Sequence, residues 1–174
     1  IRGVQTGGAI TFGAGKTLTL TNDDGPLKIS TANSKTITVN FNGTLVGGTG
    51  NNINGFARST VNFATTYSGD NFLGDMNPAL GSDVTPVVYN INGTVKTKNL
   101  FLYGNSNSVN IATTGSLNVT GELTTEDDKS SRITIATSRT ASGSLYAPNA
   151  TYRDHNTDGD DDRTRLTFNR PIDN

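Results

Sequence analysis

The sequence predicts an all-β fold in which short strands stack as the rungs of a β-solenoid. Thr or another polar residue alternates with an aliphatic one in five short segments. Alternation places one face of a strand in a core and the other in water, and closely spaced Gly and Asn residues exclude long helices. Only 32% of the residues are hydrophobic, which fits a thin, elongated core better than a compact globule. The five segments are Thr17–Thr21, Lys35–Asn40, Ser108–Ala112, Ser116–Thr120 and Arg132–Ala136.

The strand pattern is most regular between residues 9 and 46. Ala9–Phe12 is followed by a Gly-rich turn at 13–16, the Thr17–Thr21 strand, and a turn at 22–25. Strands recur after roughly eight to ten residues, as expected when each coil holds two or three of them. Outward Thr residues suit a pleated surface because the β-branched side chain favours strand geometry.

Two segments interrupt this pattern and are expected as loop insertions, near residues 47–58 and 67–86. The second carries several apolar residues, among them Phe72, Leu73 and Met76. They form either a small satellite core beneath the loop or a patch that contacts a partner. We therefore treat these three residues as the candidate partner-binding site.

Strands resume at Val87, and the composition changes again near residue 150. We divide the chain into a solenoid segment, 1–150, and a C-terminal segment, 151–174, that holds an acidic loop and a final strand at Arg165–Phe168. Asn-Gly and Thr-Gly pairs between the strands supply the backbone conformations that tight corners require.

The acidic loop is the strongest local motif in the sequence. Residues 154–162 read Asp-x-Asn-x-Asp-Gly-x-x-Asp, a pattern that resembles the first nine positions of an EF-hand calcium loop. Arg165 stands where an EF-hand has its bidentate Glu, so we expect a calcium loop without flanking helices; the alternative is a solvated acidic linker. On that resemblance the calcium ligands are Asp154, Asn156, Asp158, Asp160 and Asp162.

Other chemistry finds little support, and we expect no enzymatic activity. His155 is the only histidine, which excludes a multi-histidine zinc site. Glycosidases and lyases need carboxylates on the rungs, but apart from Glu122 the acidic residues sit mostly in turns. The Thr-x-Thr triplets suggest an ice-binding face, but their spacing drifts, so they read as ordinary outward strand positions.

Charge and cysteine content restrict the partners and the location. The formal net charge is −1, and no basic cluster is present, which argues against nucleic acid as a partner. No apolar stretch approaches the length of a membrane span. A secreted eukaryotic module of this size would more often carry disulfides, so the absence of Cys favours a bacterial surface or phage protein.

Phrases such as Gly8–Phe12, Gly15–Leu20 and Gly115–Val119, in a chain without Cys, resemble the passenger domains of bacterial autotransporters, most closely rickettsial outer-membrane surface antigens. The resemblance lies in the repeated strand and turn phrases over residues 7–46 and 87–147, and no single diagnostic motif carries it. It implies a right-handed parallel β-helix displayed on the cell surface, often as an adhesin.

Two functions follow as expectations. The first is a non-enzymatic bacterial cell-surface adhesin or display segment, stabilised by calcium, that binds a protein or glycan of a host or neighbouring cell. The alternative is a carbohydrate-binding or carbohydrate-processing β-helix of the phage-tail or lyase type. The fold itself does not decide between them, because solenoid scaffolds serve many functions.

Overall fold

The chain folds into parallel β-sheets, shown by a computed structural model of the 174 residues. The described residues form strands, turns and bends, and none of them lies in a helix. The all-β class and the parallel pairing predicted from the sequence are thereby confirmed. The structure describes residues 2–3, 7–19, 27–31, 35–46, 53–55, 59–64, 75–77, 87–102, 107–125, 132–152 and 165–169.

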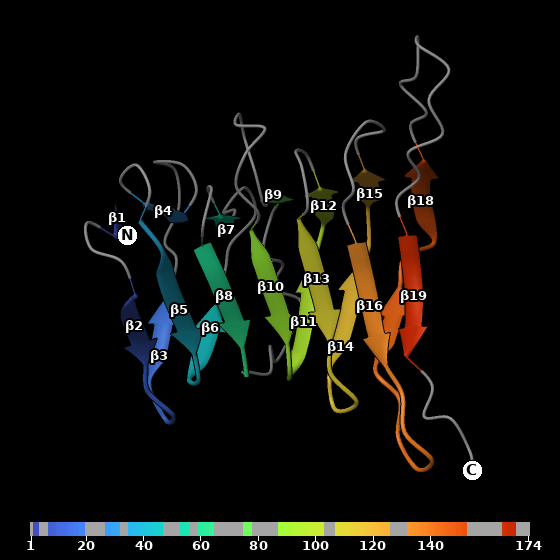
Figure 1. Cartoon of the computed structure of the whole chain (residues 1–174), viewed down its shortest axis with the longest axis horizontal. Coiled ribbons are helices and arrows are strands. Elements are labelled where there is room, and N and C mark those ends of the chain that lie inside the picture. Colours follow the sequence, from blue (N-terminus) through green and yellow to red (C-terminus); the bar gives the residue numbers. More distant parts are fainter. Residues whose placement is uncertain are drawn as a thin grey trace, which may run out of the picture.

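Two seven-stranded sheets run along the long axis of the molecule (Figure 1). The first sheet has the order β1 (Arg2–Gly3), β4 (Leu27–Thr31), β7 (Ile53–Gly55), β9 (Asp75–Asn77), β12 (Asn99–Leu102), β15 (Glu122–Thr125) and β18 (Asn149–Tyr152). The second sheet has the order β2 (Gly8–Phe12), β5 (Ile37–Phe41), β8 (Ser59–Phe63), β10 (Val88–Ile91), β13 (Ser108–Ile111), β16 (Arg132–Ala136) and β19 (Arg165–Asn169).

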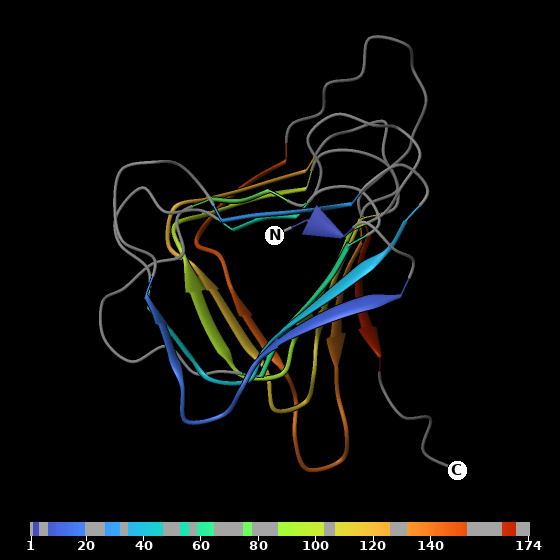
Figure 2. The same cartoon turned by 90° about the vertical axis from the view of Figure 1, so that its left-hand side faces the viewer.

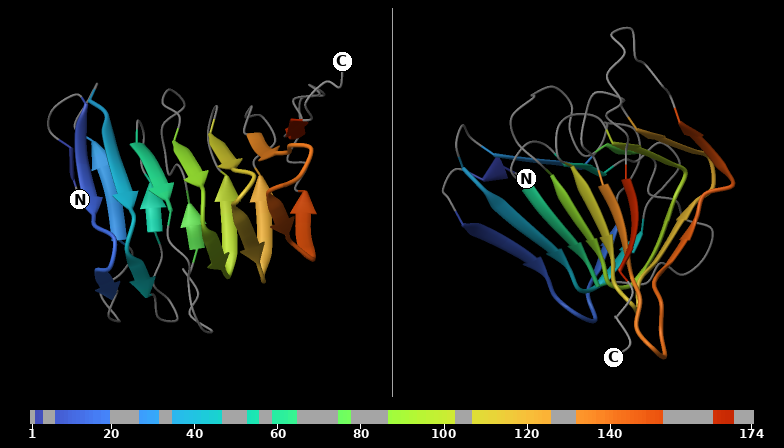
Figure 3. Two further views of the ribbon diagram at one scale, coloured as in Figure 1. Left: turned by 90° about the horizontal axis from the view of Figure 1, so that it is seen from below. Right: turned by 45° about the vertical axis from the view of Figure 1, so that its right-hand side comes forward.

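Two smaller sheets form a third side. One pairs β3 (Thr17–Thr19) with β6 (Thr44–Val46), and the other has the order β11 (Thr94–Thr97), β14 (Ser116–Val119) and β17 (Ser144–Tyr146). Seen end-on, the sheets lie on three sides of a shared interior (Figure 2). Two further views show that the strands of each sheet succeed one another along the long axis of the molecule (Figure 3).

Parallel register is kept from one strand to the next in the second sheet. Val39 lies opposite Val61, Val61 opposite Tyr89, and Tyr89 opposite Val109. The chain separation between paired residues nevertheless varies, being 29 residues from Thr11 to Asn40 and 20 from Asn90 to Asn110. Variation in length is therefore absorbed by the connections and leaves the strand pairing unchanged.

The core is built by strict alternation along the strands. In β5 the three apolar residues Ile37, Val39 and Phe41 are buried, while Thr38 and Asn40 between them are half-buried on the outer face. The same pattern repeats in β8, β10 and β13. Burying an apolar side chain of this size stabilises a fold by roughly 1.5–3 kcal/mol, so the repeated interior rows supply most of the driving force.

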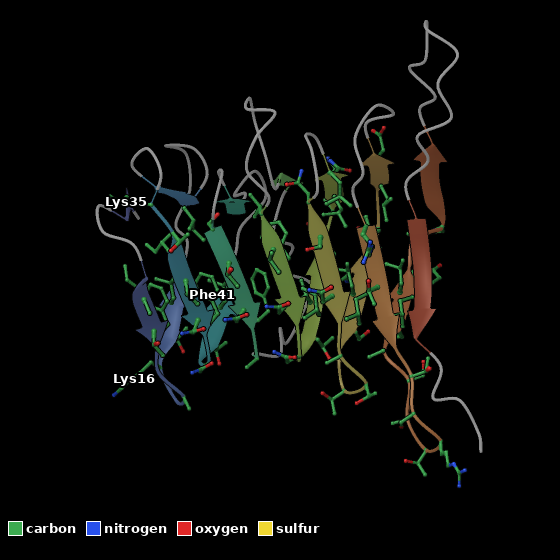
Figure 4. All side chains as sticks on the ribbon, in the orientation of Figure 1. Lys16, Lys35 and Phe41 are labelled. Carbon is green, nitrogen blue, oxygen red and sulfur yellow. The ribbon has the colours of Figure 1, made fainter. Side chains whose placement is uncertain are left out.

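Aromatic rings stack inside the first half of the second sheet. Phe12 and Phe41 lie 5.2 Å apart between ring centroids and Phe41 and Phe63 lie 5.5 Å apart, both pairs nearly parallel; Tyr89 follows at 6.1 Å. Figure 4 shows the Phe41 side chain among the sheets, whereas Lys16 points away from them. Parallel pairing places the three Phe residues in one register row, whereas Tyr89 pairs with Val61 and contacts Phe63 from the neighbouring row.

The structure places a short strand inside each range that was expected as a loop insertion. β7 lies within residues 47–58 and β9 within residues 67–86, and the two pair with each other in the first sheet. At the other end, β18 crosses residue 150 and β19 pairs with β16. Both seven-stranded sheets therefore continue past the expected boundary.

Candidate binding faces and connecting segments

Most residues singled out from the sequence lie outside the described residues. These are the five acidic-loop residues Asp154, Asn156, Asp158, Asp160 and Asp162, together with His155, Phe72 and Leu73. Met76 belongs to β9, where its backbone pairs with Leu100 of β12 and with Ile53 of β7. Its side chain is outside the described part, so its apolar contacts remain a prediction.

The outer face of the second sheet carries a continuous row of asparagine amides. Asn40, Asn62, Asn90 and Asn110 occupy the same register position in β5, β8, β10 and β13. The Nδ2 of Asn62 donates to Oδ1 of Asn40 at 2.6 Å, and Nδ2 of Asn90 donates to Oδ1 of Asn62 at 2.7 Å. Asn110 extends the row at 2.9 Å, donating to Asn90.

Threonines stand at both described ends of this amide row. Asn40 donates its Nδ2 to Oγ1 of Thr11 at 3.0 Å, and Thr134 lies opposite Asn110. Each amide has two N–H groups and an oxygen with two lone pairs. In this ladder Asn40, Asn62 and Asn90 each use one N–H and one lone pair, so one of each remains per residue, repeated at the strand spacing of about 4.8 Å.

A second outward row runs beside the amide row and is chemically mixed. It contains Ala9, Thr38, Thr60, Val88, Ser108 and Arg132 in successive strands. Thr38 and Thr60 are thus followed by an aliphatic, a hydroxyl and a charged side chain. A flat, uniform array of threonines is not formed along this row.

The three-stranded sheet presents a different combination of side chains on its outer face. Lys96 of β11, Asn118 of β14 and Tyr146 of β17 share one register position. Tyr146 is 60% exposed, although it is a large aromatic residue. The Oδ1 atom of Asn118 is buried and has no hydrogen-bond partner. An exposed ring beside an amide and a cation is a combination suited to stacking and hydrogen bonding with a polar ligand.

Two other asparagines, the buried Asn107 and the half-buried Asn99, accept hydrogen bonds from the backbone. Asn107 is fully buried, and its Oδ1 accepts from the backbone N–H of Val87 at 3.0 Å. Asn99 plays the same part at the first sheet, where its Oδ1 accepts from the backbone N–H of Glu122 at 2.9 Å. These amides satisfy main-chain donors where strands begin, so we assign them to the fold.

The connections between sheets differ sharply from side to side. Those from the first sheet to the second range from residues 56–58, between β7 and β8, to residues 153–164, between β18 and β19. Those from the second sheet to the third side include the two-residue corners Asn42–Gly43 and Asn92–Gly93. Because the strands are parallel and in register, the connections from the first sheet to the second all begin along one edge of the first sheet and end along one edge of the second. The connections that lead into the first sheet also vary in length, from residue 98, between β11 and β12, to residues 64–74, between β8 and β9.

Within the described ranges, no group of three or more His, Cys, Asp or Glu side chains is placed to hold a metal ion. The acidic loop lies outside these ranges, so the calcium hypothesis stays a prediction. The part of the chain that the structure describes also contains no helix long and apolar enough to cross a membrane.

Comparisons with known proteins gave no match to a protein-family model, to a curated protein or to a solved structure.

The amide row was not anticipated from the sequence, although a signal for it exists. Asparagine recurs between two apolar residues in Val39-Asn40-Phe41, Val61-Asn62-Phe63, Tyr89-Asn90-Ile91 and Val109-Asn110-Ile111. Alternation alone assigns these positions to the outer face. Only the parallel register shows that they stack directly on one another.

Proposed function

We propose that the chain is a non-enzymatic segment of a bacterial cell-surface adhesin, built as a right-handed parallel β-helix that displays its connecting segments to a partner. The observation that carries this proposal is the row of connections from the first sheet to the second, which differ in length while the register of the sheets that they join does not change. A regular scaffold with variable segments on one side is a common basis for recognition.

The β-helix interpretation rests on two supports. Each described passage of the chain adds one strand to the first sheet and then one to the second, in constant order. Crossover connections between parallel strands of one sheet are right-handed in nearly all proteins, which supports the proposed hand. The resemblance to autotransporter passenger domains supports the extracellular location.

The display function is tested by shortening two connections and measuring binding to host cells and matrix proteins. Residues 78–86 and 153–164 are each replaced by a short Gly-Ser linker, which leaves strands β9, β18 and β19 in place. At least one replacement is expected to reduce binding several-fold while the β-type circular dichroism spectrum is unchanged.

A matched control alters the corner between β16 and β17, on another side of the molecule. Arg139 and Thr140 are exposed there, so Arg139→Ser with Thr140→Ala is expected to leave binding unchanged. Full binding by both shortened variants, or equal loss in the control, contradicts the proposal.

Calcium binding by the acidic loop is part of the proposal and has a separate test. Isothermal titration with calcium is expected to give heat with the parent chain and none with Asp158→Ala. Thermal stability is expected to rise with calcium by mass action in the parent only. Absence of heat at millimolar calcium removes calcium from the proposal and leaves the display function standing.

A second candidate function, carbohydrate binding, is favoured by the exposed ring of Tyr146 beside Asn118 and Lys96. Retention on a polysaccharide panel is expected to be lost in Tyr146→Ala and kept in Tyr146→Phe, which preserves the ring. No retention of the parent chain across a broad panel rejects this function.

A further inference from the structure

The amide row on the outer face of the second sheet keeps hydrogen-bonding groups that the fold does not use. Its four asparagines are half-buried, and among the described residues their amides bond only to one another and to Thr11. An amide is planar, and the hydrogen trans to its oxygen points opposite to the C=O bond, as a head-to-tail ladder requires. The second hydrogen then points along the Cβ–Cγ bond, which leads out of the sheet. The row therefore presents one outward N–H per strand.

The four strands that carry the row lie side by side within the sheet (Figure 1). β5 lies between β2 and β8, and β13 lies between β10 and β16, so each asparagine has a described strand on both sides. The outward N–H groups repeat at about 4.8 Å. They also share one direction, because each Nδ2 donates to the preceding Oδ1. A ligand that uses several of these groups must extend along the sheet and repeat at a similar spacing.

The side chains around the row are small and uncharged. The outward row beside it carries Thr38, Thr60, Val88 and Ser108 in β5, β8, β10 and β13. The positions two residues after each asparagine are Asn42, Ala64, Asn92 and Ala112. In this described part of the sheet no long side chain stands beside the amides. The absence of charge favours a neutral ligand, because phosphate-bearing polymers bind through clustered Lys and Arg.

The spacing and the size of this face distinguish between the neutral polymers that remain. An extended peptide repeats every two residues, at about 6.7 Å, and falls out of step with the row. A pyranose unit of an extended glycan has nearly the length of one strand spacing, and its hydroxyls both donate and accept. The four strands offer on the order of 250 Å². A stable protein interface needs about 800 Å² on each partner, so this face suits an oligosaccharide better than a protein.

We propose that the amide row binds a linear, neutral oligosaccharide in an extended conformation, with one pyranose per strand. Each outward N–H donates to a sugar oxygen, and the remaining amide lone pairs accept from sugar hydroxyls. The inference goes beyond the proposed display function. It also concerns a different side of the molecule from the exposed ring of Tyr146, so either site can fail without the other.

Nuclear magnetic resonance of the side-chain amides tests the contact directly, with cellotetraose as the probe. The amide signals of Asn40, Asn62, Asn90 and Asn110 are expected to shift together, with a Kd on the order of 1 mM, because these bonds replace bonds to water. Cellobiose spans only two strands and is expected to bind about five-fold more weakly or less. The signal of Asn107, which is fully buried and bonded to the backbone, is expected to stay unchanged.

Maltotetraose is the matched control ligand. It has the same monomer and the same charge, but its chain coils, so its hydroxyls do not keep step with the row. It is expected to bind about five-fold more weakly than cellotetraose, or less. Equal binding of the two overturns the proposed register. Absence of shifts in the row with both cellotetraose and xylotetraose at about 10 mM overturns the site. Shifts confined to Asn118 would instead place the glycan on the side of Tyr146.

A variant that covers the row gives a second, independent readout. Val88 is half-buried in the neighbouring outward row, two residues before Asn90, so Val88→Arg places a long side chain beside the amides. Its affinity for cellotetraose is expected to fall about five-fold or more, with an unchanged circular dichroism spectrum. Thr94→Arg adds the same group at an exposed position of β11, on another side, and is expected to bind like the parent. Equal affinities of the two variants overturn the proposal.

Discussion

At the scale of single residues, the corners between sheets explain why glycine recurs in the sequence. A Cβ at Gly115 would collide with the backbone carbonyl of Ile91, in the preceding strand of the second sheet, and one at Gly43 would collide with the carbonyl of Lys16. Neither obstacle is a flexible side chain that can move aside. These corners pack backbone against backbone, so the residue there must lack a Cβ.

Gly115→Ala is therefore expected to destabilise the fold by about 1–3 kcal/mol, because the added methyl group overpacks a corner that lacks room for it. Urea unfolding followed by circular dichroism measures the difference. Gly13→Ala is the matched control: a Cβ there would meet nothing within 4 Å, and its effect is expected to stay within about 1 kcal/mol. Equal effects at the two positions contradict the steric explanation.

Asn118 offers a residue-scale prediction of the opposite sign. Its Oδ1 is buried without a partner, and such a group destabilises a fold by roughly 1–3 kcal/mol. Asn118→Val removes the unpaired oxygen and introduces a β-branched residue suited to β14. We expect the melting temperature to rise by a few degrees. A clear fall in the melting temperature would mean that the amide nitrogen of Asn118 stabilises the fold by more than the unpaired oxygen destabilises it.

At the scale of elements, the amide row links five strands through side chains as well as backbone. Each inner asparagine both donates to one neighbour and accepts from the other, as Asn62 does between Asn40 and Asn90. Chains of such bonds polarise one another, so the row is expected to behave as a unit. It also fixes register, because a slip of one residue would place these amides in the core.

Asn62→Ala removes two of these bonds, and we expect it to destabilise the fold by about 1–3 kcal/mol. Thr60→Ala, in the neighbouring outward row of the same strand, is the control and is expected to have a smaller effect. In a double-mutant cycle, Asn62→Ala and Asn90→Ala are expected to be non-additive, because they share one hydrogen bond. Additive effects in chemical denaturation would show that the row is a set of independent contacts.

At the scale of the whole molecule, the free energy needed to open a strand is expected to vary along the long axis. Strands contact mainly the strands before and after them in the same sheet, so each rung is supported by its neighbours. β8 and β10 have a strand on both sides, whereas β2 ends its sheet.

Hydrogen exchange followed by mass spectrometry is expected to show this gradient. Amides of β8, β10 and β13 should exchange most slowly, and those of β2 at least ten-fold faster, because edge strands open with less free energy. Uniform protection from β2 to β13 would instead indicate all-or-none opening.

A feature of this fold could be predicted from the sequence when its cause lies in neighbouring residues of the chain. The alternation in Lys35–Asn40 and Ser108–Ala112 is a local pattern, and it correctly predicted strands with one buried face. The strands β7 and β9 were not predicted, because each has three residues, which is too short for an alternating pattern to be recognised. They form because neighbouring strands supply their backbone hydrogen-bond partners. The amide row was missed for a related reason, since it depends on which strands become neighbours.

Constant register with variable connections also bears on how such a chain changes over generations. One passage from a strand of the second sheet to the next takes between 20 residues, from Asn90 to Asn110, and 33 residues, from Arg132 to Arg165, yet each passage keeps the register of the sheet. Gaining or losing one complete passage would join compatible rows, and a change of length within a connection would be absorbed there, whereas gaining one residue within a strand would exchange its inner and outer rows. Descendants of a common ancestor should therefore differ in length by whole passages or within connections, and an alignment of them should show few gaps inside the strands.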